Sequence, residues 1–422
     1  SPDGGSEVVH LKPGGPLDAA VVLVGVANEG GVKPFLGTDY YRREYRLIWW
    51  PNQNWYMSMT PQSLWRDLRD PVARKQLWDV IFYRKHNVSL ANWPFVNRFA
   101  MYIRRDIVQQ MWDYGPEAFT APETLPSDEY TQRWVEVPAT AIWGAPGGGP
   151  GQLLAPKGLA RDGEGQVYVA DSQNHRIQVF DAQGQFVRAW GSEGVNPGQF
   201  KEPWGVAVAP DGTVYVADTW NHRIQAFDRE GAFLRMWGAF GEVAAPDAFP
   251  ELFYGPRDVE VDAEGYVYVS DTGNKRVIKY DPYGGMVWAV GGEGSGEGQL
   301  LEPVGIAVAE DGSLYVADTW NQRIQVFDAE GHFVRQWRVY AWSGMSVVNK
   351  PYLALDPQGS VYATDPEGYR VMQFDARGQL LAVWGQYGHD EVSMNLPTGI
   401  DVDAGGRIVV SDADNGRLLI FR

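Results

Sequence analysis

An aspartate followed five residues later by an arginine recurs six times along this chain of 422 residues. Successive copies are 47 residues apart, except the second and third, which are 53 apart. A fixed period of this length is typical of repeated supersecondary units, and the longer step indicates one lengthened loop. The pairs are Asp171 with Arg176, Asp218 with Arg223, Asp271 with Arg276, Asp318 with Arg323, Asp365 with Arg370, and Asp412 with Arg417.

Each copy has the pattern of four short strands. In the fourth copy, apolar runs between Pro303 and Trp337 are separated by Asp-Gly and Glu-Gly pairs, which favour tight hairpins. Six such sheets leave no long open edge when they are arranged around an axis. The sequence therefore predicts a mainly β protein with a six-bladed β-propeller over residues 134–422. The last copy ends after three strands, and we expect residues 134–144 to supply its fourth.

The repeats resemble the NHL family over about residues 134–422. The segments 171–181, 218–228 and 318–328 carry the resemblance; the second reads Asp-Thr-Trp-Asn-His-Arg-Ile-Gln-Ala-Phe-Asp. The fifth copy departs from this pattern, with Pro366-Glu367-Gly368 after its aspartate. The resemblance implies a propeller that acts as a binding module, and it names no ligand.

Charge and composition exclude several classes of site. Residues 134–422 carry the whole formal net charge of −17, with 21 basic against 38 acidic side chains. Nucleic-acid binding relies on clustered positive charge, so we expect no nucleic-acid partner. The chain has no cysteine, which excludes disulfides and cysteine metal sites. It also has no apolar run near the roughly 18 residues of a membrane-spanning helix.

Six equivalent Asp–Arg pairs around a ring are better explained as structural ion pairs than as a reaction centre, because buried charges are usually paired. His175 and His222, at the same offset in adjacent repeats, are the metal candidates. The other four repeats have no histidine there, and a zinc site normally needs three or four protein ligands. We therefore expect no metal, no other cofactor and no catalytic residue.

Positions that vary on a constant scaffold are where recognition usually occurs. In each repeat, the start of the first strand and the loop between the second and third strands emerge on one face. The aromatic and charged residues at these positions form the predicted binding face: Lys157, Trp204, Trp220, Arg257, Asp258, Trp320 and Tyr352. Such a face suits a glycan, a peptide or a protein. The alternative is that Trp220 and Trp320 pack against a neighbouring blade or under the N-terminal domain.

The insertion between the second and third repeats lengthens a loop on the same face. It contains Phe240, Phe249, Leu252, Phe253 and Tyr254, which are too apolar for a loop left in water. We expect this loop to cover the mouth of the central channel or to contact a partner.

The first 133 residues have a different pattern. Strand-like segments at Ala19–Ala27 and Tyr45–Trp50 precede helical periodicity over Pro61–Lys85 and Asn97–Tyr114. We therefore predict a small α/β domain over residues 1–115. Residues 116–133 have the composition of a proline-rich linker.

A second resemblance concerns about residues 15–115. The segments Pro34–Pro51, Leu77–Arg84 and Arg104–Asp106 resemble the soluble C-terminal portion of bacterial multi-spanning membrane proteins of glycosyltransferase-like type. The resemblance implies an extracytoplasmic domain associated with lipid-linked sugar transfer. It supplies no catalytic residue for this chain.

Together these features favour a non-catalytic, extracytoplasmic binding and assembly module that recognises a glycan, peptide or protein as an accessory of envelope glycosylation. One alternative is a structural subunit of an extracellular filament or surface layer, assembled as a homo-oligomer. Another is a metal-dependent propeller hydrolase or lyase that uses His175 and His222. A membrane-embedded partner or parent region also stays open, because the chain begins at Ser1 without an initiator methionine.

Overall fold

A computed structural model describes residues 21–25, 40–47, 97–104, 130–342 and 350–422. The chain divides into two compact units, residues 1–119 and residues 120–422. Within the described ranges, no helix is long and apolar enough to cross a membrane.

The first unit contains an antiparallel sheet with strand order β1-β3-β2. Its strands are β1 (Val21–Gly25), β2 (Tyr40–Leu47) and β3 (Asn97–Arg104). β3 corrects the first part of the helix expected over Asn97–Tyr114, and residues 105–114 lie outside the described residues. β3 contains a short uninterrupted apolar run, Phe99–Ile103, which suits a strand of this length. It pairs with β2 over all eight residues and with β1 over residues 99–103. The helix expected over Pro61–Lys85 lies outside the described residues.

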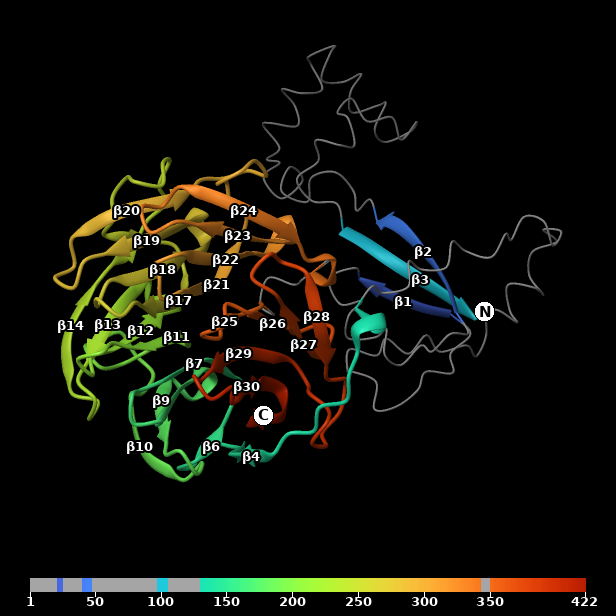
Figure 1. Cartoon of the computed structure of the whole chain (residues 1–422), viewed down its shortest axis with the longest axis horizontal. Coiled ribbons are helices and arrows are strands. Elements are labelled where there is room, and N and C mark those ends of the chain that lie inside the picture. The colour runs from blue at the N-terminus through green and yellow to red at the C-terminus, as the bar shows by residue number, and fades with distance from the viewer. Residues whose placement is uncertain (1–20, 26–39, 48–96, 105–129, 343–349) are drawn as a thin grey trace, which may run out of the picture. The chain divides into compact units, whose positions relative to one another are not determined.

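The second unit is a six-bladed β-propeller (Figure 1), which confirms the predicted architecture. Each blade is a four-stranded antiparallel sheet, and the first strands of neighbouring blades contact one another around the central channel. Blades 1 to 3 are β7 (Pro156–Arg161), β8 (Val167–Asp171), β9 (Arg176–Phe180) and β10 (Phe186–Trp190); β11 (Pro203–Val208), β12 (Val214–Asp218), β13 (Arg223–Phe227) and β14 (Phe233–Trp237); and β17 (Pro256–Val261), β18 (Val267–Asp271), β19 (Arg276–Tyr280) and β20 (Met286–Gly291).

Blades 4 and 5 continue the same order, and six apolar clusters fill the six interfaces between neighbouring blades. These blades are β21 (Pro303–Val308), β22 (Leu314–Asp318), β23 (Arg323–Phe327) and β24 (Phe333–Arg338); and β25 (Leu353–Leu355), β26 (Val361–Asp365), β27 (Arg370–Phe374) and β28 (Leu380–Trp384). Two short parallel pairs lie in the connections between blades: β5 (Ala145–Pro146) with β6 (Gln152–Leu153), and β15 (Ala239–Phe240) with β16 (Leu252–Phe253).

Blade 6 closes the ring with a strand from before blade 1. It consists of β29 (Pro397–Val402), β30 (Ile408–Asp412), β31 (Arg417–Phe421) and β4 (Ala141–Trp143). The closing strand is shorter than the predicted 134–144, because Trp134 forms a bridge to Val383 in blade 5 instead. Tyr130, at the end of the predicted linker, is buried in the apolar cluster between blades 4 and 5.

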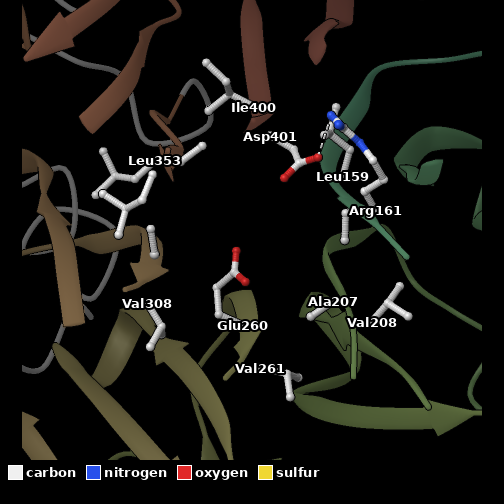
Figure 2. A pocket seen from close by; sticks show the side chains of 14 residues that line it. Leu159, Arg161, Ala207, Val208, Glu260, Val261, Val308, Leu353, Ile400 and Asp401 are labelled. Carbon is white, nitrogen blue, oxygen red and sulfur yellow. Dashed lines mark ion pairs between the residues drawn. The ribbon is translucent and has the colours of Figure 1, made fainter. Parts of the chain in front are cut away.

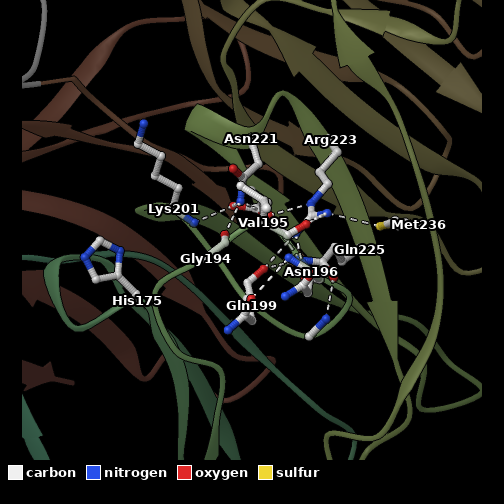
Figure 3. A network of polar contacts seen from close by, with 12 residues as sticks. His175, Gly194, Val195, Asn196, Gln199, Lys201, Asn221, Arg223, Gln225 and Met236 are labelled. Atoms are coloured by element: carbon white, nitrogen blue, oxygen red, sulfur yellow. Dashed lines mark hydrogen bonds and ion pairs between the residues drawn. The ribbon is translucent and has the colours of Figure 1, made fainter.

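The repeated Asp–Arg pattern forms an equivalent ion pair in every blade. The arginine Nε lies 2.7–2.9 Å from an aspartate oxygen in all six pairs. In blade 2, Arg223 also donates to the backbone carbonyls of Val195, Asn196 and Gln199 (Figure 3). Each pair therefore joins the second and third strands, and in blade 2 it also fixes the loop that enters the blade.

Short 3₁₀ turns separate the aspartate from the arginine in five blades. These turns are η4 (Ser172–Asn174), η5 (Thr219–Asn221), η6 (Thr272–Asn274), η7 (Thr319–Asn321) and η9 (Ala413–Asn415); two further ones are η3 (Thr131–Arg133) and η8 (Tyr340–Trp342). The residue after each of the five turns has a left-handed backbone with φ between 54° and 58°. His175 and His222 occupy two of these places.

Candidate binding face

The propeller has two faces that differ in their loops. We call one the insertion face: it carries the turns between second and third strands and the connections between blades, including the insertion 239–254. We call the other the turn face: it carries the hairpins that join first to second strands and third to fourth strands. An antiparallel sheet reverses direction at each connection, so all seven residues of the predicted binding face belong to the insertion-face end.

Five of those seven residues are buried at the insertion-face end of the channel: Lys157, Trp204, Arg257, Asp258 and Tyr352. The Lys157 ammonium and the Arg257 guanidinium lie 4.7 Å and 4.6 Å from the Trp204 ring centroid. The Tyr352 hydroxyl donates to the Arg257 carbonyl at 3.2 Å, which joins blade 5 to blade 3. Side chains from four blades therefore fill this end of the channel, which corrects the expectation that these residues form an open ligand surface.

Asp258 and Tyr352 occupy a position at which the other four blades have glycine. Strand pairing aligns them with Gly158, Gly205, Gly305 and Gly399. A Cβ at Gly205 would lie 2.7 Å from the Asp258 Cα, and one at Gly305 would lie 2.4 Å from the Tyr352 Cα. Glycine thus lets neighbouring first strands approach each other where these two larger residues stand.

Burial shifts the acid–base behaviour of this end of the channel. It raises the pKa of Asp258 to about 8, although the carboxylate accepts hydrogen bonds from the backbone of Ile306 and Val259. It lowers the pKa values of Lys157 and Lys350 to about 8. Lys350 is fully buried, and its ammonium lies 3.5 Å from Glu302.

Asp258→Gly gives blade 3 the residue that four other blades have, and it should reduce the pH dependence of stability. The folded chain keeps the Asp258 proton up to about pH 8, whereas the ordinary pKa is 3.8. The folded state therefore binds more protons in this window, and this carboxyl makes the free energy of unfolding fall as pH rises. Urea unfolding at about pH 5 and pH 8 measures the slope. Glu310→Gln, an exposed turn-face control, should keep the parent slope; an unchanged slope in Asp258→Gly would contradict the assignment.

The two remaining residues of the predicted face differ in exposure. Trp220 is half-buried, and its indole N–H donates to Glu202 at 3.1 Å. Trp320 is 44% exposed, with the Lys350 ammonium 5.0 Å from its ring centroid. It borders a hollow of about 490 Å³ whose lining includes Gln336 and Arg338. Trp320 thus offers an accessible ring, and Trp220 mainly supports its own blade.

The insertion holds an aromatic cluster on the same face. The Phe240 ring centroid lies 4.9 Å from that of His222 and 5.3 Å from that of Tyr254. Phe240 and Phe249 are 58% and 62% exposed, whereas Phe253 is fully buried. The loop therefore anchors itself with one aromatic side chain and presents others to solvent.

Exposed apolar side chains are distributed unequally between the faces. Within residues 130–342 and 350–422, the large exposed apolar side chains of insertion-face loops are Leu154, Val195, Phe240, Phe249, Tyr254, Trp320 and Tyr340. The hairpins of the turn face have one in the same ranges, Tyr283, and are otherwise rich in aspartate and glutamate.

The two metal candidates each bind the backbone. His175 accepts a hydrogen bond through Nδ1 from the Glu202 N–H, and His222 accepts one from the Gly255 N–H. In the part of the chain that the structure describes, the one cluster with metal-ligand geometry is Asp328, Glu330 and His332 on a turn-face hairpin. The two histidines therefore connect neighbouring blades and do not converge on a third ligand.

Comparison with known proteins identifies the repeat. Four segments match the NHL repeat: residues 153–180, 200–227, 300–327 and 394–421. The B-box type zinc finger protein ncl-1 of Caenorhabditis elegans is 56% identical over 36 residues, which are 8% of this chain and 4% of that protein. Protein lin-41 of the same organism is 44% identical over 45 residues, 11% of this chain and 4% of that protein. The matched region thus spans about 4% of the length of these curated relatives.

Solved structures of other proteins align with this chain at low identity. A virginiamycin B lyase from Staphylococcus aureus with quinupristin is 13% identical with a TM-score of 0.45, covering 66% of this chain and 82% of that one. A gluconolactonase from Xanthomonas campestris is 16% identical with a TM-score of 0.47, covering 68% and 98%. Neither likeness bears on activity. The sequence matches and the ring of six sheets together establish that the chain carries NHL repeats in a six-bladed β-propeller.

Proposed function

We propose that this chain is a non-catalytic binding and assembly module whose insertion face captures a protein partner. The observation that carries the proposal is the concentration of exposed apolar side chains in the loops of that face. Isolated apolar side chains are normal on a surface, but a group of them on one face is typical of an interaction site. Aromatic residues such as Phe240, Tyr254 and Trp320 also suit the anchoring positions of protein interfaces.

The fixed geometry of the aromatic cluster supports the same proposal. Tyr254 contacts His222 and Phe240 edge to face, and His222 and Phe240 meet at a tilt. Arg276 holds the insertion through its backbone carbonyls. A partner that binds this surface would not have to order a loose loop first, which reduces the entropy cost of association. The anchor side chains we assign are Phe240, Phe249, Tyr254 and Trp320.

The proposal includes an extracytoplasmic location, which rests on the resemblance of residues 15–115 to the soluble part of membrane glycosyltransferase-like proteins. A glycan is the second candidate ligand, because exposed aromatic rings also stack on sugars. The exposed Trp320 ring beside the hollow at blade 4 is the feature that favours it.

Single-cysteine labelling tests the face and the location together, because the chain has no cysteine of its own. Phe240→Cys reports on the insertion face, and Tyr283→Cys, at a residue that is 90% exposed on the turn face, is the matched control. Both variants are treated on intact cells with a membrane-impermeant maleimide that carries a photo-crosslinker. We expect both to be labelled and only Phe240→Cys to give a discrete adduct, identified by mass spectrometry as protein or glycan.

Four outcomes contradict parts of the proposal separately. Equal adducts from both positions, or none from position 240, would contradict the insertion-face assignment. Labelling only after cell lysis would contradict the extracytoplasmic location, and crosslinking in the lysate would still test the face. A discrete adduct that consists of glycan would replace the protein partner by the second candidate.

A further inference from the structure

The turn-face end of the channel contains a cavity of about 200 Å³. All six first strands line it, and most of the lining side chains are aliphatic, among them Leu159, Val261, Leu353 and Ile400 (Figure 2). The other end of the channel is filled by Trp204, Tyr352 and their neighbours, so the cavity is a pocket that ends inside the ring.

Two acidic residues interrupt an otherwise uniform ring of alanines in this pocket. Strand pairing places one residue of each blade at the same level: Ala160, Ala207, Glu260, Ala307, Ala354 and Asp401. Glu260 belongs to blade 3 and Asp401 to blade 6, so the two acids lie on opposite sides of a six-fold ring. Figure 2 shows the Glu260 carboxyl pointing into the cavity towards the side where Asp401 lies.

The two carboxylates differ in their partners. Asp401 lies 2.9 Å from the Arg161 guanidinium, which also contacts Asp403 at 2.6 Å. Glu260 forms no ion pair with any residue of the described ranges, and its polar neighbour is the backbone N–H of Val261. Arg161 is thus already engaged by two aspartates, which leaves Glu260 as an acidic side chain of the pocket that can accept a cation as its partner.

Burial raises the pKa of Glu260 well above its ordinary value, and the nearby charges of Asp258 and Asp401 raise it further. These shifts favour the protonated form of Glu260. A cation between the two acids would favour the ionised form, so its binding should be coupled to proton release from Glu260. The titratable and charged groups that face Glu260 are Asp258 on its own strand and Asp401, with its partner Arg161, across the channel.

We propose that this pocket binds a small alkylammonium ion, with the ammonium group between Glu260 and Asp401 and the alkyl chain against the aliphatic wall. The wall favours an organic cation over a hydrated metal ion, because aliphatic side chains offer no ligands to replace lost water. A cavity of about 150 Å³ in another protein admits benzene, so this one has room for an amine of about four to six carbons. The ammonium is carried by a free amine or by a lysine side chain that enters from the turn face.

The site goes beyond the proposed function and does not depend on it, because partner capture uses the opposite face. Calorimetric titration of the full chain with n-butylammonium chloride tests it. n-Butanol serves as the neutral analogue of equal shape, and calcium chloride serves as the metal control. We expect butylammonium alone to bind, with proton release that appears as a different observed heat in buffers of different ionisation enthalpy.

Glu260→Gln keeps the shape of the side chain and removes its charge, and should weaken butylammonium binding by about tenfold or more, the range for loss of a charge-assisted hydrogen bond. Glu310→Gln on an exposed turn-face hairpin is the control and should bind as the parent does. A peptide with one central lysine distinguishes a free amine from a lysine side chain as the natural ligand. If the peptide binds more weakly than butylammonium, the site is assigned to free amines. No butylammonium binding, equal binding by both variants, or binding of calcium in place of the amine would overturn the proposal.

Discussion

Replacing Arg276 with methionine is expected to lower the free energy of unfolding by about 3–5 kcal/mol, the range for removing one partner of a buried ion pair. Both side chains of the Asp271–Arg276 pair are 0% exposed. The guanidinium also donates to the carbonyls of Pro246, Ala248 and Leu252, which belong to the insertion. The substitution therefore leaves a buried carboxylate without its counterion and releases the loop that carries the exposed aromatic side chains.

Arg176→Met is the matched control, because Arg176 is the equivalent residue of blade 1 and its side chain is 16% exposed. Water can compensate part of its loss, so the cost should be smaller. Denaturant unfolding of both variants measures the difference, and limited proteolysis should cut residues 241–251 faster in Arg276→Met alone. Equal losses of stability in the two variants would contradict the special role of the blade 3 pair.

Replacing Trp143 with alanine is expected to cost about 3–5 kcal/mol of unfolding free energy, the range for deleting a buried aromatic side chain. Trp143 lies on β4, the strand that closes the ring, and packs between blades 6 and 1 with Leu153 and Leu418. Its ring also has the Arg407 guanidinium 5.8 Å from its centroid. The cavity would open at the one blade whose strands come from both ends of the propeller sequence.

Ile142→Ala controls for the strand itself, since Ile142 is the neighbouring residue of β4 and is 45% exposed. We expect this variant to lose about 1 kcal/mol or less, because a surface substitution removes little buried area. Thermal and denaturant unfolding of the two variants provide the measurement. An Ile142→Ala variant as unstable as Trp143→Ala would mean that β4 contributes pairing and not packing.

The architecture could be predicted because the same sequence repeat occurs six times. The period of 47 residues, the Asp-Gly hairpins and the incomplete last copy specify the blades and their closure without any tertiary information. The lengthened loop could also be predicted, because large apolar residues such as Phe240 and Phe249 are unusual in a connection between blades. In the first unit, the prediction of helical periodicity from Asn97 overlooked the short apolar run Phe99–Ile103, whose length suits a strand.

The burial of the predicted face could not be read from single repeats. Lys157, Trp204, Arg257 and Tyr352 each resemble surface residues within their own blade. They become buried because six first strands converge on one axis and place these side chains against one another. The structural position of Tyr352 is also hard to read from the sequence. The first strand of blade 5 is one residue shorter after its proline, so Tyr352 aligns with the glycines of other blades and not with the residue that follows proline.

The acidic pair of the channel, Glu260 and Asp401, can be found in the sequence when the six repeats are aligned exactly. Aligning the repeats by their aspartates gives alanine at four equivalent positions and an acid at two, three blades apart. Only the ring geometry makes that separation meaningful, because three blades out of six lead to the opposite wall.

Ring closure by β4 also sets the order in which the propeller can be completed during synthesis. Blades 1 to 5 are each made of contiguous sequence, but a hydrogen bond from Thr140 to Ile420 joins residues 280 positions apart. Blade 6 must wait until β31 has left the ribosome, and contacts of such long range form slowly. During this interval blades 1 and 5 each expose the apolar sheet face that blade 6 later covers, and exposed apolar surface makes folding intermediates prone to aggregation. The last step of folding therefore decides when the nascent protein becomes safe from aggregation.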